Sequence, residues 1–390
     1  MTERLCGPSK DRPSSPAGHP GFPAMGRREL LKAADGLAAG GLAAALAGCA
    51  APAPEPEPFD PTSLVYPPPP EIPRFYYDRT IWGSTSVTEE SSTDRFKRFA
   101  TGQSERGTGM AKPFGVAAQD GRVFVSDTVS RRVHVFDFPS KRYYDIGTKG
   151  VGRMTKPMGM ALDQSGKLYV VDNTARRVLI YDLEGGYINS IGHDAGFERA
   201  TAVAVTPDGD RIYVLDTGGV QNSNHQVLLF NASGRLLKTI GTRGEGDGEF
   251  NLPLDCALGP DGRLYVLDTG NFRVQVFDPE GNFLSTFGGA GRFAGDFSHP
   301  KGIAIDAENK IYVTDTAFGI FQIFDGEGQI LMSIGDRSEA GATPASFLLP
   351  SGIAVDFDSR IYVADQFHRK VEVFRPAAVP EDWPVGQRLV

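Results

Sequence analysis

The sequence has few cysteines, no basic run and no long hydrophobic segment. Only 3 of its 390 residues are cysteine, 40 Lys and Arg stand against 48 Asp and Glu, and the formal net charge is −8. Proteins that bind the phosphate backbone depend on clustered Lys and Arg, so this composition argues against nucleic acid as a partner. The weakly hydrophobic run at residues 36–47 is too short to span a membrane.

Short motifs that indicate a particular catalytic or binding chemistry are also absent from the sequence. The chain contains no nucleotide-binding loop, no zinc-protease helix and no nucleophile elbow. Cys256 stands in an otherwise apolar strand, so we expect it to be a small buried thiol and expect no disulfide in the mature chain.

What the chain has instead is a recurring β pattern. Between residues 300 and 335, four runs rich in Ile, Val, Tyr and Phe are separated by Gly, Asp and Asn, at residues 302–306, 311–315, 321–325 and 329–334. This pattern predicts a four-stranded meander. Such a unit cannot bury both of its faces alone, so it needs neighbours of its own kind.

The same block occurs six times. Its clearest part is an aromatic residue, Val, any residue and Asp, and the six aspartates are Asp127, Asp172, Asp216, Asp268, Asp315 and Asp365. Successive aspartates are 45, 44, 52, 47 and 50 residues apart. Periods of about 40 to 50 residues with several strands per unit predict propeller blades.

Three segments carry a family resemblance. Residues 300–306 (PKGIAID), 271–278 (NFRVQVFD) and 282–288 (NFLSTFG) resemble the NHL repeat. The expected fold is an all-β, six-bladed NHL-type propeller over residues 74–375, followed by a tail at 376–390. Residues 75–83 look like an isolated fourth strand, which the last repeat lacks, so this N-terminal strand should complete the last blade and close the ring.

Residues 1–49 are expected to be a signal segment. Residues 26–32 (GRRELLK) resemble a twin-arginine signal, and residues 46–49 (LAGC) look like a bacterial lipobox that would lipidate Cys49. The resemblance implies export to the bacterial cell envelope with a lipid anchor, and the Ala residues after Cys49 favour the outer over the inner membrane. Met25 is the expected true start. The alternative interpretation is a Gly/Ala-rich linker that happens to contain a cysteine.

Residues 50–73 are expected to be a linker. Ten of these 24 residues are proline, which favours an extended polyproline II spacer between the anchor and the propeller. The tetraproline at residues 67–70 could instead dock a partner.

The residue after the proline that begins each inner strand should line the mouth of the central channel, with Ala200 in place of the proline in the third repeat. These six residues are Phe114, Met158, Thr201, Leu254, Lys301 and Ser351. The NHL-like peptidyl-amidating lyases place zinc-binding histidines here, and gluconolactonase-like propellers use Asn and acidic residues for calcium. This ring provides neither ligand set, so we predict no metal and no cofactor. A cation bound by the glycine-rich loop at residues 244–249 is left open.

The repeated aspartates, and the arginines Arg132, Arg177 and Arg273 that precede third strands, are expected to be structural. Blade three has an enlarged loop that contains Asn222, Asn224 and His225, and loops on a rigid scaffold often carry recognition. Phe272, Phe318, Phe367 and His368 lie in equivalent loops.

These observations predict a monomeric, non-catalytic scaffold that binds a protein or peptide partner on its mouth face. The rival hypothesis is a metal-dependent lyase or lactonase that uses His225, His368 and nearby aspartates.

Overall fold

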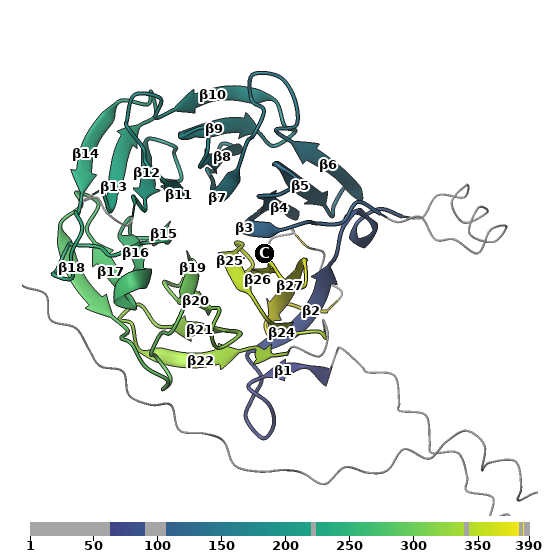
Figure 1. Ribbon diagram of the computed structural model, residues 1–390. Coiled ribbons are helices and arrows are strands. Elements are labelled where there is room, and N and C mark those ends of the chain that lie inside the picture. The colour runs from purple at the N-terminus through teal and green to yellow at the C-terminus, as the bar shows by residue number, and fades with distance from the viewer. Residues whose placement is uncertain (1–62, 90–106, 220–223, 339–342, 382–384, 386–390) are drawn as a thin grey trace, which may run out of the picture. The chain divides into compact units, whose positions relative to one another are not determined.

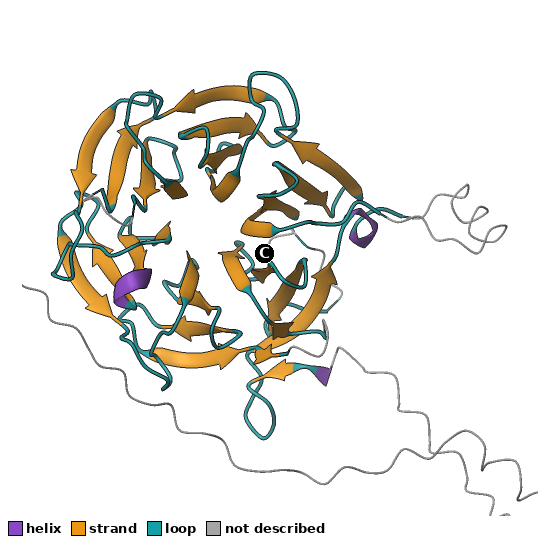
Figure 2. Ribbon diagram, viewed as in Figure 1, coloured by secondary structure: helices purple, strands orange, loops and turns teal. Residues whose placement is uncertain are grey.

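The chain forms a ring of six blades around a central channel (Figure 1). The computed structural model describes residues 63–89, 107–219, 224–338, 343–381 and 385. Each blade has four antiparallel strands, the first of which lies at the channel, and the sheet of blade 6 has a fifth, short strand outside its fourth. Strands make up nearly all of the regular structure (Figure 2), and short 3-10 turns occur at η2 (Ser84–Ser86) and η3 (Thr269–Asn271). The predicted all-β six-bladed propeller is confirmed.

The strands of each blade lie in a fixed order from the channel outward. Blade 1 contains β3 (Pro113–Gln119), β4 (Arg122–Asp127), β5 (Arg132–Asp137) and β6 (Arg142–Ile146); blade 2 contains β7 (Pro157–Leu162), β8 (Lys167–Asp172), β9 (Arg177–Asp182) and β10 (Tyr187–Ile191); blade 3 contains β11 (Ala200–Val205), β12 (Arg211–Asp216), β13 (Gln226–Asn231) and β14 (Leu236–Ile240); blade 4 contains β15 (Asp255–Leu258), β16 (Leu264–Asp268), β17 (Arg273–Phe277) and β18 (Phe283–Phe287); blade 5 contains β19 (Pro300–Ile305), β20 (Ile311–Asp315), β21 (Ile320–Phe324) and β22 (Ile330–Ile334); blade 6 contains β25 (Pro350–Val355), β26 (Ile361–Asp365), β27 (Lys370–Pro376) and β2 (Phe75–Ile81). A short parallel pair, β23 (Asp336–Arg337) and β24 (Ser346–Phe347), lies in the segment between blades 5 and 6.

The apolar core lies between the blades. The buried apolar side chains form clusters that each combine residues of two neighbouring blades, such as Val171 of blade 2 with Val214 of blade 3. Both faces of the second and third strands are therefore buried, which explains why these strands are apolar at successive positions. Each blade is stable only with a neighbour on either side, and the ring has to close.

Closure joins the two ends of the described chain. β2 pairs with β27 from Phe75 opposite Pro376 to Ile81 opposite Val371, so the N-terminal strand completes blade 6, as predicted. Side chains reinforce this seam, because the Thr80 hydroxyl donates to Glu372 Oε2 (2.8 Å) and Glu372 pairs with the buried ammonium of Lys370. Lys370 Nζ also donates to the carbonyl oxygen of Thr343 (2.9 Å).

The predicted linker at residues 50–73 extends into the fold, which corrects its boundary. β1 (Val65–Tyr66) pairs with Phe75 and Tyr76 of β2, and the loop between them contains the tetraproline. The side chain of Tyr66 packs edge-to-face on the Phe374 ring at 5.9 Å, so this end of the segment is part of the blade 6 core. The signal segment at residues 1–49 lies outside the described residues. Within the described ranges, no helix is long and apolar enough to cross a membrane.

We call the segment that joins the fourth strand of one blade to the first strand of the next a connector. The six repeated aspartates hold these connectors in place, because each accepts hydrogen bonds from backbone N–H groups of the connector before its blade. Asp127, Asp172, Asp216, Asp315 and Asp365 also accept from the loop between the second and third strands. Their predicted structural role is confirmed.

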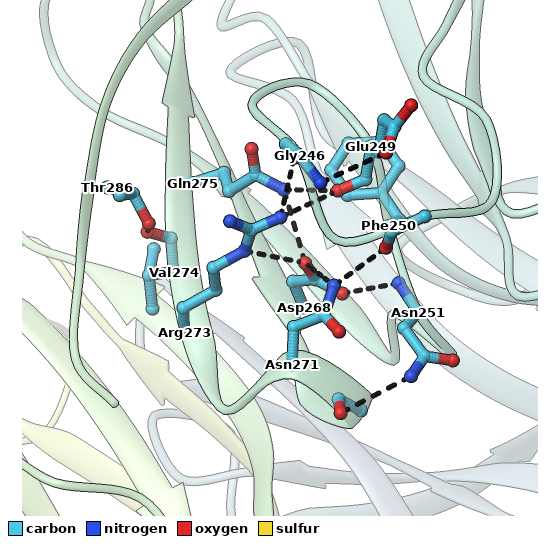
Figure 3. A network of polar contacts seen from close by, with 12 residues as sticks. Gly246, Glu249, Phe250, Asn251, Asp268, Asn271, Arg273, Val274, Gln275 and Thr286 are labelled. Carbon is cyan, nitrogen blue, oxygen red and sulfur yellow. Dashed lines mark hydrogen bonds and ion pairs between the residues drawn. The ribbon is translucent and has the colours of Figure 1, made fainter. Parts of the chain in front are cut away.

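Blade 4 shows the fullest version of this network (Figure 3). Asp268 accepts from Asn251 N at 2.7 Å and pairs with Arg273 Nε at 2.9 Å. Arg273 also donates to the carbonyl oxygens of Gly246 and Glu249 in the connector. The guanidinium of Arg273 therefore binds the glycine-rich loop at residues 244–249 to blade 4.

We call the face of the ring that carries the connectors and the loops between second and third strands the connector face. It is the face on which the inner strands begin, so it surrounds the mouth of the channel.

Candidate binding site in the central channel

The first strands of all six blades enclose a cavity of about 240 Å³ on the axis of the ring. Its wall consists mainly of backbone and of small or aliphatic side chains. Among the described lining residues, Asp255 of blade 4 and Lys301 of blade 5 are the two with charged side chains. Phe114 of blade 1 contributes an aromatic ring to the same wall.

The inner strands approach each other too closely to admit most side chains. A Cβ atom added to Gly302 would lie 2.3 Å from the carbonyl oxygen of Ser351, and one added to Gly352 would lie 2.6 Å from that of Phe114. Real Cβ atoms do not come this close to backbone atoms. The second position after the strand-initiating residue is accordingly small in five of the blades, where it is Gly115, Gly159, Ala202, Gly302 or Gly352.

Asp255 stands at this position in blade 4. Its Oδ2 accepts from the backbone N–H of Ile303 in blade 5 (3.0 Å), and its Oδ1 accepts from the N–H of Cys256 (2.9 Å). Burial raises the pKa of Asp255 to about 7, against the opposing effect of these two hydrogen bonds. A carboxyl group with this pKa exchanges its proton near neutral pH, which is the property expected of a functional group.

Asp255 was not predicted from the sequence, although a signal for it was present. Alignment of the repeats at the proline, or at Ala200 in the third repeat, shows Gly or Ala at this position in all five of the other blades. A carboxylate in a column of small residues breaks the repeat pattern without an evident packing reason. Inspecting the residue two places after the proline, in addition to the next residue, would have found it.

Lys301 lies close to the mouth of the channel. Its Nζ donates to Gln366 Oε1 (3.0 Å) and lies 5.9 Å from the centre of the Phe114 ring. Burial lowers the pKa of Lys301 to about 8, the ammonium of Lys112 adds to this shift, and Asp365 opposes it. Lys301 forms no ion pair with any carboxylate among the described residues.

Four other positions of the predicted mouth ring do not line the cavity. Met158 packs in the apolar layer between blades 2 and 3. Thr201 is buried and exchanges a hydrogen bond with Thr217 at 2.7 Å, and the buried Ser351 donates to the carbonyl oxygen of Phe114 at 2.9 Å. Leu254 is half-buried, and its backbone N–H donates to Leu267. Met158, Thr201 and Ser351 instead make their contacts inside the fold.

The two histidines of the rival hypothesis are held in structural contacts. His225 is fully buried, and its Nδ1 accepts from the backbone N–H of Leu252 (3.1 Å). His368 is largely buried, with its Nδ1 2.9 Å from Asp365 Oδ2. These contacts correct the expectation that both histidines are available at the mouth. No set of three or more His, Cys, Asp or Glu side chains within the described residues is arranged to hold a metal ion.

The remaining loop residues differ in exposure. Phe367 is 56% exposed beside His368, whereas Phe272 and Phe318 are half-buried. Asn224 is half-buried at the end of the enlarged loop, and Asn222 lies outside the described residues. Cys256 is buried, as expected, and burial followed by the charge of Asp255 raises the pKa of its thiol.

Exposed apolar side chains occur at several places on the connector face. Phe293 and Val151, on connectors, are 83% and 75% exposed, and Val129 and Phe367, on loops between second and third strands, are 61% and 56% exposed. The backbone that carries the last two is fixed by the aspartate network, because Val129 and Phe367 donate directly to Asp127 and Asp365.

Comparison with known proteins agrees with this architecture. The NHL repeat family matches residues 250–277, and a family described as a 6-bladed beta-propeller matches residues 111–206. The chain is a six-bladed β-propeller of the NHL-repeat type. No curated protein matches the sequence.

Several solved structures share the fold at low sequence identity. A protein of unknown function from Bacteroides thetaiotaomicron is 16% identical, with a TM-score of 0.57 over 77% of this chain and 76% of that one. A gluconolactonase from Xanthomonas campestris is 18% identical, with a TM-score of 0.53 over 68% of this chain and 86% of that one. A streptogramin B lyase is 13% identical, with a TM-score of 0.51 over 68% and 94%. At these identities the likeness concerns the fold alone.

Proposed function

We propose that this chain is a non-catalytic binding module of the bacterial cell envelope, which holds a protein or peptide partner on its connector face. The observation that carries the proposal is the pair of exposed aromatic side chains, Phe293 and Phe367, on loops of that face. Exposed aromatic residues on a rigid backbone are characteristic of binding surfaces, because they bury a large area at little cost in conformational entropy.

The fixed backbone of the connector face supports the same function. Phe293 N donates to Asp296 Oδ2 (3.0 Å), and Asp296 is held in turn because its carbonyl oxygen accepts from Gln322 Nε2 (2.8 Å). Phe367 N donates to Asp365 Oδ1 (2.9 Å). A surface that is already ordered loses little entropy when a partner binds.

Site-specific photo-crosslinking in intact cells tests this proposal. A photoreactive residue is placed at position 293 or 367, and matched controls carry it at Leu237 and Leu284, which are 46% exposed on the outer strands. A discrete cross-linked product at positions 293 and 367, absent at 237 and 284, is the expected result. Equal products at all four positions, or none at 293 and 367, would refute the proposed binding face.

The anchoring of the protein is part of the same proposal. We place the chain in the cell envelope, at the outer membrane, through a lipid on Cys49, and we propose that it acts as a monomer without a cofactor. Metabolic labelling with a radioactive fatty acid should label the wild-type chain and fail to label Cys49→Ser. Equal labelling of the two chains would remove the lipid anchor from the proposal.

A further inference from the structure

The ammonium group of Lys301 in the channel has different partners from the other cations that the fold removes from solvent. Two other cations that the fold removes from solvent have carboxylate partners: Lys370 pairs with Glu372, and Arg273 pairs with Asp268 at 2.9 Å. The half-buried Arg177 donates to the backbone carbonyl oxygen of Val151. Lys301 is half-buried and has the side-chain oxygen of Gln366 and the face of Phe114 instead. An ammonium removed from water without a counter-charge destabilises a fold, so its retention in a cavity suggests that a ligand supplies the missing charge.

We propose that the mouth of the central channel is a carboxylate-binding site, in which the Lys301 ammonium forms an ion pair with one carboxylate beside the Phe114 ring. The carboxylate has two sources, a free small organic acid or the carboxylate of a bound peptide. The second source rests on the proposed function, because it requires a partner on the connector face.

The charges around the cavity select a single carboxylate over a more highly charged anion. Lys301 is the only cation of the described cavity wall, and Asp255 of the same wall becomes negative as the pH rises. Asp365 lies close enough to Lys301 to affect its titration. A phosphate dianion would bring two negative charges near Asp255 and Asp365, with only the Lys301 ammonium to offset the repulsion. A carboxylate brings one negative charge, which one ammonium neutralises.

The protonation states give the site a defined pH dependence. The charged groups that affect the titration of Lys301 are Lys112 and Asp365, and Asp255 of the neighbouring blade lines the same cavity. Below pH 7 Lys301 is charged and Asp255 is mostly protonated, so the cation is present and the repulsion is absent. Above pH 8 Lys301 loses its proton and Asp255 is ionised. Affinity for a carboxylate therefore falls as the pH rises from about 6 to about 9.

Titration calorimetry of the full-length chain with defined probes tests the site. The probes are acetate, acetyl-trialanine with a free carboxylate, the same peptide as its amide, and the capped peptide acetyl-Ala-Glu-Ala amide. At pH 6 the carboxylate probes should bind and the trialanine amide should not. Lys301→Gln should weaken binding by about tenfold to a hundredfold, the range expected for a lost charged hydrogen bond.

Lys112→Gln is the matched control, because Lys112 is an exposed lysine near the same mouth. It should change affinity by less than about threefold, since it contributes only a screened charge. Asp255→Asn should reduce the loss of affinity between pH 6 and 8, because it removes the charge that Asp255 gains over this range. A cooperative thermal melting transition of each variant would show that it has folded.

The outcomes separate this inference from the proposed function. Failure of all carboxylate probes to bind at millimolar concentration, or equal binding by Lys301→Gln and the wild type, overturns the carboxylate site. Binding of acetate as tight as that of either peptide assigns the site to a small organic acid, and tighter binding of a peptide assigns it to a partner. The cross-linking result at positions 293 and 367 stands or falls separately.

Discussion

The connections between blades and the wall of the channel use buried charge in opposite ways. In blade 4, the carboxylate of Asp268 has four hydrogen-bond donors, and one of them is the guanidinium of Arg273. In the channel, among the residues that the structure describes, Asp255 has two backbone donors and no cation, and Lys301 has no carboxylate. The first arrangement stabilises the ring. Burial raises the pKa of both aspartates, but Asp268 has a guanidinium and three further donors, whereas Asp255 has two backbone donors and its pKa reaches about 7. The channel is therefore the better candidate for function.

The largest expected effect comes from removing the Asp268–Arg273 ion pair of blade 4. Asp268→Ala leaves the Arg273 guanidinium and the buried N–H of Asn251 without their acceptor. We expect the free energy of unfolding to fall by about 3–5 kcal/mol, the range for a buried ion pair that loses one partner. Urea denaturation followed by circular dichroism measures the change.

Asp278 provides the control for this prediction. It lies in the same blade and accepts a backbone hydrogen bond from Asn282, but its carboxylate is exposed to solvent. Asp278→Ala should have a much smaller effect. Similar losses for the two variants would mean that the connector network is not what stabilises the blade.

The second prediction concerns the Lys370–Glu372 ion pair of blade 6, which occupies the positions of Arg273 and Gln275 in blade 4. Lys370 and Glu372 stand five and seven residues after Asp365, as Arg273 and Gln275 do after Asp268. Glu372→Ala should lower the free energy of unfolding by about 3 kcal/mol, because it leaves Lys370 buried without a counter-charge at the ring closure.

The double variant Lys370→Arg with Glu372→Gln restores a network of the blade 4 type. We expect it to stay within about 1 kcal/mol of the wild type in the same denaturation experiment, because a well-bonded polar replacement of a buried ion pair is close to neutral. A loss as large as that of Glu372→Ala would show that the two blades depend on different interactions.

The sequence predicted the fold because the repeat appears six times. The aromatic residue, Val and Asp at the end of each second strand gave the length of the repeat and marked where these strands end. All six aspartates have the predicted structural role, because each accepts hydrogen bonds from a connector. The isolated strand at residues 75–81 could be assigned to blade 6 because the last repeat visibly lacked its fourth strand.

The site was harder to predict because it depends on distances between blades. The sequence correctly brought Phe114 and Lys301 to the channel but could not show that Thr201 bonds Thr217 or that Ser351 bonds the backbone of blade 1. His225 follows an enlarged loop, which suggested exposure, yet its ring fills a buried position under Leu252. The direction of a side chain next to a close backbone contact is a tertiary property.

The third prediction concerns Asp255 on the unpaired side. Its pKa in the folded chain, about 7, lies above the value of about 4 in the unfolded chain, so its ionised form opposes folding and stability is lost as the pH rises from 4 to 7. The stability of Asp255→Asn relative to the wild type should therefore increase by about 2 kcal/mol between pH 4 and pH 8, after allowance for partial contact with solvent. The change with pH is the test, because the Asn amide can accept only one of the two backbone hydrogen bonds that Asp255 accepts. A gain that is the same at both pH values would mean that packing, and not charge, is responsible.

The smallest of these effects is expected at Lys301. Its pKa falls from about 10.4 in the unfolded chain to about 8 in the folded one, so the charged form opposes folding in full below pH 8 and the effect disappears as the pH rises toward 10.4. Lys301→Met, which keeps the length of the side chain, should stabilise the protein by about 1–2 kcal/mol at pH 7 and by less at pH 10.

The decisive measurement for Lys301 repeats the denaturation in excess acetate. If a carboxylate completes the ion pair, acetate will stabilise the wild type and leave Lys301→Met unchanged, because a ligand stabilises only the chain that binds it. Equal responses of the two chains to acetate would leave the unpaired ammonium without a ligand and remove the distinction between the channel and the blades.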